Sequence, residues 1–324
     1  MNTSDVFLIS LFAVAALLLT AVPGYLLVKK KVLSEKGTVD FSRLLIFITQ
    51  PALAIYTFQV TEYSLEKLKS IGIFALLCVA VNGIMLGGAY LLFKKKSENP
   101  IYRVMTVATT FGNCAFFGIP IIEAIFPTEA KELIIYTTVY ALVMNVLSWT
   151  VGSAIISGNG KYISVKHIFL NPALIAFFVS LTLYVLRIPL AFTIPGTQMR
   201  FTLLLDIITI AGRMATPLSM LIMGMRLATM SFKDVFCEKR FYLTLFIKQV
   251  IMPLVALLIV YFLPIPSSEK RVLYIICACP IASIVLNYAE LCGVGQKEGA
   301  GLVLVGTIGS IITLPVMTLL LGVF

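Results

Sequence analysis

Two stretches of the sequence combine polar residues with helix-breaking residues inside apolar runs. The first, residues 109–122, reads Thr-Thr-Phe-Gly-Asn-Cys-Ala-Phe-Phe-Gly-Ile-Pro-Ile-Ile and contains Asn113 and Pro120. Pro120 has no N–H to donate, and its ring clashes with the carbonyl group one turn earlier. If the helix unwinds there, the N-terminus of its second half offers free N–H groups and a positive partial charge to an anion. The alternative is a simple proline kink, with the neighbouring glycines serving close packing.

The second stretch is Cys-Pro-Ile-Ala-Ser at residues 279–283, followed by Asn287. Two interrupted helices at matching positions in the two halves of a chain indicate a transporter site. We expect them to cross at their breaks, with Asn113 and Asn287 orienting a bound anion. For either asparagine alone, a hydrogen bond that packs two helices together is the alternative role.

Charged residues inside apolar runs are a second set of candidates, because such residues are rare in membrane helices and often mark pathways. The planar guanidinium of Arg213 can hold a carboxylate, unless its own helix end or the membrane interface satisfies it. Asp206 and Glu123 are candidates for proton coupling, unless they lie in water at the outer boundary. Lys248 and the adjacent Gln249 are expected to reach towards the membrane surface, and a functional role is the alternative.

Neutral polar residues near the centres of other runs complete the candidates. Gln50 precedes Pro51, and Tyr140 lies just over one turn before Asn145. Such residues suit a cavity between helices. The predicted substrate-binding residues are Asn113, Cys114, Gly118, Pro120, Gln50, Pro51, Tyr140, Asn145, Arg213, Pro280, Ser283 and Asn287.

Other kinds of chemistry lack the residues that they need. His167 is the only histidine and lies in a basic loop, so a histidine-based metal site or catalytic triad is not expected. Neither a P-loop nor a dinucleotide-binding motif occurs. We expect no enzyme activity, no metal and no cofactor.

The elements that must position these residues are membrane-spanning helices. The sequence is 60% hydrophobic and 12% charged, with a mean hydropathy of +1.02, whereas a soluble surface needs about twice that charge. The apolar runs have the length that crosses a bilayer of about 30 Å. Ten spans are predicted, at about 6–28, 39–59, 71–93, 101–126, 133–156, 172–189, 200–228, 241–263, 272–292 and 298–322.

The basic residues set the predicted orientation. The net charge of +10 comes from short clusters between the spans, such as Lys94 to Lys96, and not from a helix face suited to nucleic acid. Fifteen lysines and arginines fall in the loops of one side and seven in those of the other. Cytoplasmic loops retain basic residues, so a multi-pass protein of the cell membrane with both termini outside is predicted. The first run is expected to be a retained helix and not a signal peptide.

An even number of spans divides into halves of five, and halves with an odd number of spans cross the membrane in opposite senses. The two halves of the sequence show weak similarities. The second span contains Pro51 and the seventh contains Pro217. The fourth and ninth spans each begin with an Arg-Val pair, at Arg103 and at Arg271. We therefore predict two inverted five-helix repeats, residues 1–160 and 161–324.

The Asn-x-x-Phe-x-Gly-x-Pro run that ends at Pro120 resembles the auxin efflux carrier family, which includes the plant exporters and bacterial relatives associated with malate or malonate. Pro51, the Pro-Leu-Ser triplet at Pro217 and the Pro280 segment add to the likeness, which covers nearly the whole chain. It implies a fold like that of bile-acid transporters and antiporters, with helices four and nine crossing at the substrate, elevator-type alternating access and homodimers. The plant exporters have their crossover proline beyond Pro280, which leaves the break point in the ninth span open.

The sequence thus favours a secondary transporter of small organic anions such as mono- or dicarboxylates. A sodium- or proton-coupled carrier of the related fold is one alternative, although the residues at the expected crossing are neutral. A membrane sensor without transport is the other. An intramembrane enzyme is disfavoured, because no nucleophile and base stand at a suitable spacing.

Overall fold

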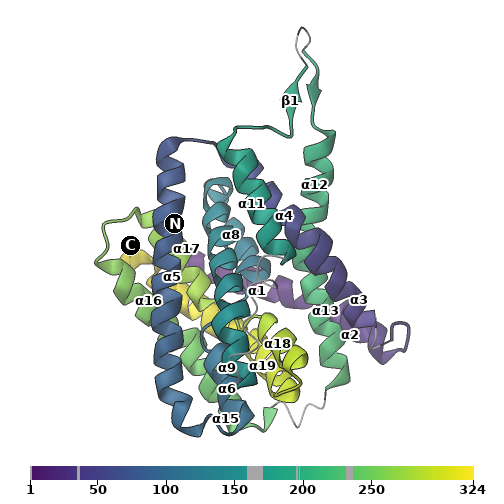
Figure 1. The fold of residues 1–324 in the computed structure, drawn as a ribbon, viewed down its shortest axis with the longest axis vertical. Coiled ribbons are helices and arrows are strands. Elements are labelled where there is room, and N and C mark those ends of the chain that lie inside the picture. The colour runs from purple at the N-terminus through teal and green to yellow at the C-terminus, as the bar shows by residue number, and fades with distance from the viewer. Residues whose placement is uncertain (1, 35–36, 159–170, 195, 197, 231–235) are drawn as a thin grey trace.

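The computed structural model describes residues 2–34, 37–158, 171–194, 196, 198–230 and 236–324. Within them the chain is a helical bundle with one short hairpin (Figure 1). The helices of the first part are α1 (Thr3–Leu19), α2 (Val22–Lys29), α3 (Gly37–Leu44), α4 (Gln50–Val60), α5 (Leu65–Phe93), α6 (Pro100–Ala108), α7 (Ile119–Ile125), α8 (Ala130–Leu147) and α9 (Ser153–Ser157). Those that follow are α11 (Pro172–Val185), α12 (Leu203–Arg213), α13 (Ala215–Thr229), α15 (Lys239–Phe246), α16 (Met252–Tyr261), α17 (Ser267–Ala278), α18 (Ile284–Cys292) and α19 (Gln296–Thr318).

Seven helical stretches of the described residues are long and apolar enough to cross a membrane. The chain is therefore an all-helical membrane protein. The remaining predicted spans fall on the shorter helix α11 and on two interrupted helices, α6 with α7 and α17 with α18. The count of ten crossings stays a prediction. The expected repeat boundary, between residues 160 and 161, and His167 lie outside the described residues.

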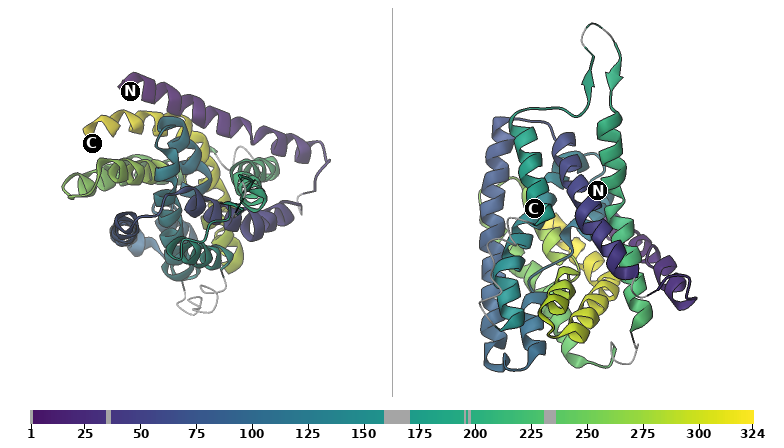
Figure 2. Two further views of the ribbon diagram at one scale, coloured as in Figure 1. Left: turned by 90° about the horizontal axis from the view of Figure 1, so that it is seen from above. Right: turned by 45° about the vertical axis from the view of Figure 1, so that its right-hand side comes forward.

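The predicted seventh span begins too early. Its first residues form β2 (Arg200–Phe201), which pairs antiparallel with β1 (Phe192–Thr193), and the helix starts only at Leu203. Gly196 in the connecting turn has a φ of 79°, which glycine adopts without strain. Figures 1 and 2 show that this hairpin projects from one end of the bundle.

Three of the prolines inside predicted spans follow a π-helical turn, and the helix continues through them. Each of Pro51, Pro120 and Pro253 is the second residue after a π-helical turn, and these turns are Leu45–Thr49, Cys114–Gly118 and Ile247–Ile251. A proline ring clashes with the carbonyl group four residues earlier, and a wider turn moves that group away. Pro120 therefore lies within a helical segment, and the interruption of the fourth span lies before it, at residues 109–113.

Glycines permit close packing of two helix pairs. A Cβ atom added to Gly24 or Gly224 would overlap the backbone of the partner helix where α2 and α13 meet. A Cβ atom on Gly212 of α12 would lie 2.9 Å from Leu53 Cα in α4. Backbone contacts of this kind are a usual means of packing helices in membranes.

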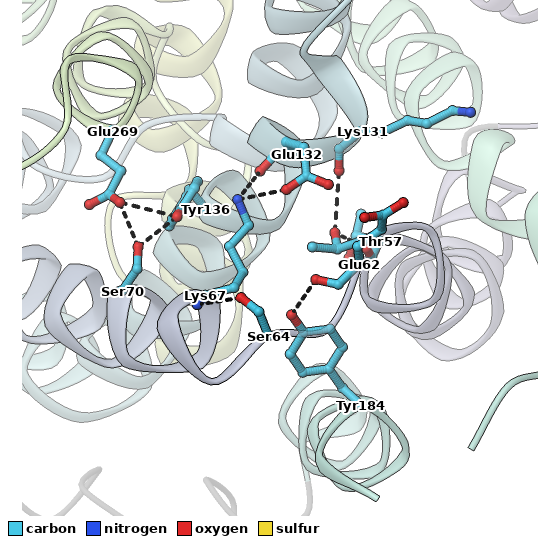
Figure 3. A network of polar contacts seen from close by, with 11 residues as sticks. Thr57, Glu62, Ser64, Lys67, Ser70, Lys131, Glu132, Tyr136, Tyr184 and Glu269 are labelled. Atoms are coloured by element: carbon cyan, nitrogen blue, oxygen red, sulfur yellow. Dashed lines mark hydrogen bonds and ion pairs between the residues drawn. The ribbon is translucent and has the colours of Figure 1, made fainter. Parts of the chain in front are cut away.

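A polar network joins the ends of α5, α8 and α17 (Figure 3). Glu269, only 3% exposed, accepts hydrogen bonds from Ser70 at 2.5 Å and from Tyr136 at 3.1 Å. Lys67 forms an ion pair with Glu132 at 2.7 Å beside them. These contacts fix one end of α17, the helix that leads to the second interruption.

The opposite end carries basic turns. The Lys94–Lys96 turn after α5 and the start of α15 lie there, at the end away from the hairpin (Figure 1). In the first turn of α15, the Arg240 side chain donates two hydrogen bonds to Glu238, the residue before the helix, and lowers the pKa of that carboxyl to about 2. The segments that the sequence assigns to the more basic side therefore include two at one end of the bundle.

Candidate functional site

The two interrupted helices meet where both lose their helical hydrogen bonds. The chain is not helical between Ala108, where α6 ends, and Cys114, and a matching gap separates α17 from α18. In these gaps the two segments run antiparallel, with Gly112 opposite Ile281. Both predicted interruptions are thus present, and the second lies at residues 279–283, around Pro280.

Hydrogen bonds between the two gaps replace those that the helices lose. The Asn113 N–H donates to the Pro280 carbonyl oxygen at 2.7 Å, and the Ala282 N–H donates to the Phe111 carbonyl oxygen at 3.0 Å. Unwound backbone inside a membrane is tolerated where its polar groups find partners in the protein. The two non-helical segments are therefore stabilised by hydrogen bonds to each other.

A cavity of about 350 Å³ lies against the crossing. Residues 114–116, in the first turn after the first gap, line it, as do Ile284, Leu286 and Asn287 in the first turn after the second. N–H groups in such first turns lack helical partners and carry a positive partial charge. The predicted site residues that line the cavity are Gln50, Asn113, Cys114, Asn145, Ser283 and Asn287.

Comparison with known proteins identifies the family of the chain. The family model of membrane transport proteins matches residues 9–318, nearly the whole chain. The chain belongs to the membrane transport protein family, that of the auxin efflux carriers. No curated protein matches this transporter in sequence. The family resemblance predicted from the motif at Asn113 is confirmed, and the family is one of transporters and not of enzymes.

Other predicted residues support the crossing without lining the cavity. A Cβ atom on Gly118 would lie 3.4 Å from Cys279 Sγ, so a small residue suits this contact. Tyr140 is fully buried and donates to Asn82 Oδ1 at 3.2 Å. Pro280 contributes its carbonyl oxygen to the crossing. The remaining two, Pro51 and Pro120, lie in the first turns of α4 and α7.

The predicted charged residues lie away from the cavity of the transporter. Arg213 is exposed and donates to the hydroxyl group of Tyr56 at 3.0 Å. Asp206, also exposed, accepts a hydrogen bond from Thr202 in the first turn of α12. Glu123 is half-buried in α7. None of these three is among the residues that line the cavity.

Lys248 lies behind the crossing, and the expectation that it reaches the membrane surface is wrong. Its side chain is fully buried, and its ammonium group donates to the Cys277 carbonyl oxygen at 2.8 Å, at the end of α17. A Cβ atom on Gly112 would lie 3.1 Å from Lys248 Nζ. Gln249 is buried as well, between the Gly306 carbonyl oxygen and Thr313.

Sequence reasoning did not select Arg226, one of two arginines that line the cavity. Arg226, near the end of α13, forms an ion pair with Glu290 of α18 at 2.8 Å and lies 3.5 Å from the Asn287 side-chain oxygen. Arg226 lies in the last turn of α13, and an arginine at a helix end usually extends its side chain to the membrane surface. The available signal was the i,i+3 spacing of Asn287 and Glu290, which puts both on one face of a helix.

Proposed function

We propose that this transporter carries small organic anions, such as mono- or dicarboxylates, and that the anion binds in the cavity beside the crossing. The observation that carries the proposal is that the first turns after both gaps line one cavity. Two helix N-termini there offer N–H groups and positive partial charge to the same ligand. Asn113 and Asn287 supply side-chain donors beside them.

The charges around the cavity support an anion in preference to a sodium ion. The charged residues that line it are Arg43, Arg226 and Glu290, which sum to one positive charge. At the crossing itself the lining residues are neutral, so no carboxylate stands there to balance the charge of a sodium ion. Glu290 is already paired with Arg226. We therefore place sodium coupling second.

For the mechanism we propose secondary transport of the elevator type, with two inverted repeats. Arg103 precedes Gly112 by nine residues, and Arg271 precedes Ile281 by ten, so the crossing lies at matching places in the two proposed repeats. The close pairs α2–α13 and α4–α12 supply a scaffold against which the crossing helices can move. We place the homodimer contact on the scaffold and the protein in the cell membrane.

Transport by the purified protein in liposomes tests the proposal. The panel contains radiolabelled acetate, pyruvate, benzoate, malonate and succinate. We expect uptake of at least one of them, and we expect Asn113→Ala to reduce its initial rate by about tenfold or more, because a buried ligand group then loses its hydrogen-bond partner.

Asn99→Ala is the matched control. Asn99 caps α6, in the same interrupted helix, but does not line the cavity. We expect this variant to keep most of the native transport rate. The absence of uptake of every panel member by native protein that is monodisperse and folded would overturn the proposal. Equal rates for the two variants would overturn the role of Asn113.

A further inference from the structure

The ion pair between Arg226 and Glu290 stands at the wall of the central cavity. Both residues line it, and both also line a second cavity of about 380 Å³ that includes Gln296 and Lys297. Arg226 belongs to α13, which packs closely on α2, and Glu290 belongs to α18, which begins at the crossing. The pair therefore joins the two groups of helices between which the cavity lies.

The hydrogen-bonding capacity of Arg226 is only partly used. Its Nη1 atom contacts one oxygen of Glu290 at 2.8 Å, and its Nη2 atom reaches the Asn287 side-chain oxygen only at 3.5 Å. Its Nε atom is buried and has no hydrogen-bond partner among the described residues. A guanidinium group binds a carboxylate best through two parallel N–H groups. Arg226 thus retains capacity for a second carboxylate.

Glu290 is a weak competitor for that arginine. Its side chain is 49% exposed, so water solvates the carboxylate, and exposed ion pairs contribute little free energy. It also lies in the last turn of α18, where the helix dipole disfavours a negative charge. A ligand carboxylate inside the cavity is less solvated by water than Glu290 and does not lie at the C-terminus of α18.

We propose that Arg226 binds the carboxylate of the transported anion and that Glu290 competes with the anion for Arg226. This inference rests on the proposed function. An internal competitor raises the apparent dissociation constant, which equals the intrinsic constant divided by the fraction of time that the site is free. The Arg226–Glu290 pair thus sets the substrate concentration at which the transporter half-saturates, and exchange of Glu290 for the anion releases α18 from α13.

The test measures half-saturation with the panel carboxylate that the native protein transports fastest. Glu290→Gln removes the competitor's charge, and we expect it to lower the half-saturating concentration roughly two- to fivefold, which is the effect of an exposed ion pair. We expect Arg226→Met to raise that concentration about tenfold or more, because the bidentate partner is lost. Ligand-dependent thermal stabilisation of the same variants gives a second readout that does not need turnover.

The pair Lys67–Glu132 provides the control. Its side-chain exposures, 18% and 45%, nearly match the 21% and 49% of Arg226 and Glu290, but it lies in the network of Figure 3, outside the cavity. We expect Glu132→Gln to leave half-saturation unchanged. An unchanged or higher half-saturation in Glu290→Gln would overturn the inference, while transport by the native protein would still support the proposed function. A native protein that transports no member of the panel would overturn both.

Discussion

Lys248 lies in a place where a charged side chain is costly. It is fully buried, and its contact with the Cys277 carbonyl oxygen satisfies only one of three donors. Its partner is a carbonyl group at a helix C-terminus, where the negative end of the dipole attracts a cation. Charged residues inside membranes usually mark pathways. Because Gly112 separates Lys248 from the cavity, we interpret its charge as a source of positive potential for an anion at the crossing.

Substitution of Lys248 by methionine tests this interpretation. Methionine keeps the length and removes the charge, so its desolvation cost disappears, and we expect an unchanged or higher Tm. We also expect the transport rate to fall by about tenfold, which corresponds to a loss of about 1.4 kcal/mol of attraction for the anion. Lys270→Met is the control, because Lys270 also donates to a carbonyl oxygen, that of Tyr261, in an exposed hydrogen bond. A large drop in Tm with native transport would show that Lys248 is only structural.

The sequence predicted the site residues that lie at helix interruptions. It did not predict those whose place depends on contacts with distant parts of the chain. Asn113 and Ser283 are the last residues of recognisable interruptions, so their place beside the cavity follows from the sequence pattern. Arg213 and Arg226 lie in the same predicted span, and the sequence favoured Arg213, which does not line the cavity. Their partners, Tyr56 and Glu290, come from distant parts of the chain, and no local pattern ranks the two arginines.

At the level of elements, the composition and length of the apolar runs predicted most helices. The positions at which two of these helices are interrupted depend on contacts between distant segments. Proline is a strong sequence signal, but a π-helical turn before Pro120 accommodates its ring. The actual gap at Gly112 is stabilised by hydrogen bonds to a segment about 170 residues away. A partner at that distance cannot be read from local propensity. The start of the seventh span was missed for the same reason, because strand pairing overrides an apolar run.

The close packing of α2 on α13 leads to a prediction at this scale. A Cβ atom on Gly224 would overlap the Ala21 carbonyl oxygen, so Gly224→Ala must push the helices apart. We expect a loss of about 2 kcal/mol and a Tm lower by several degrees, measured by thermal unfolding in detergent. Gly88→Ala in α5 is the control, because no atom lies within 4 Å of the added Cβ atom. A Tm unchanged in Gly224→Ala would contradict the contact between these helices.

For the whole molecule, the uneven distribution of basic residues predicts which end faces the cytoplasm. The Lys94–Lys96 turn and the start of α15 lie at the end opposite the hairpin of β1 and β2 (Figure 1). Cytoplasmic loops retain basic residues, so the hairpin is predicted outside and Cys237, just before α15, inside. Cys237 is the exposed cysteine of the chain; Cys292 is half-buried and the other four are buried.

Cysteine labelling in intact cells therefore measures the orientation with an internal control. Thr193 is exposed in β1, and we expect a membrane-impermeant maleimide to label Thr193→Cys from outside but not the native protein. After the membrane is permeabilised, Cys237 is expected to react in both proteins. Labelling of native Cys237 in intact cells would show the reverse orientation, and the Arg226–Glu290 pair, near the same end of α13, would then face the outside.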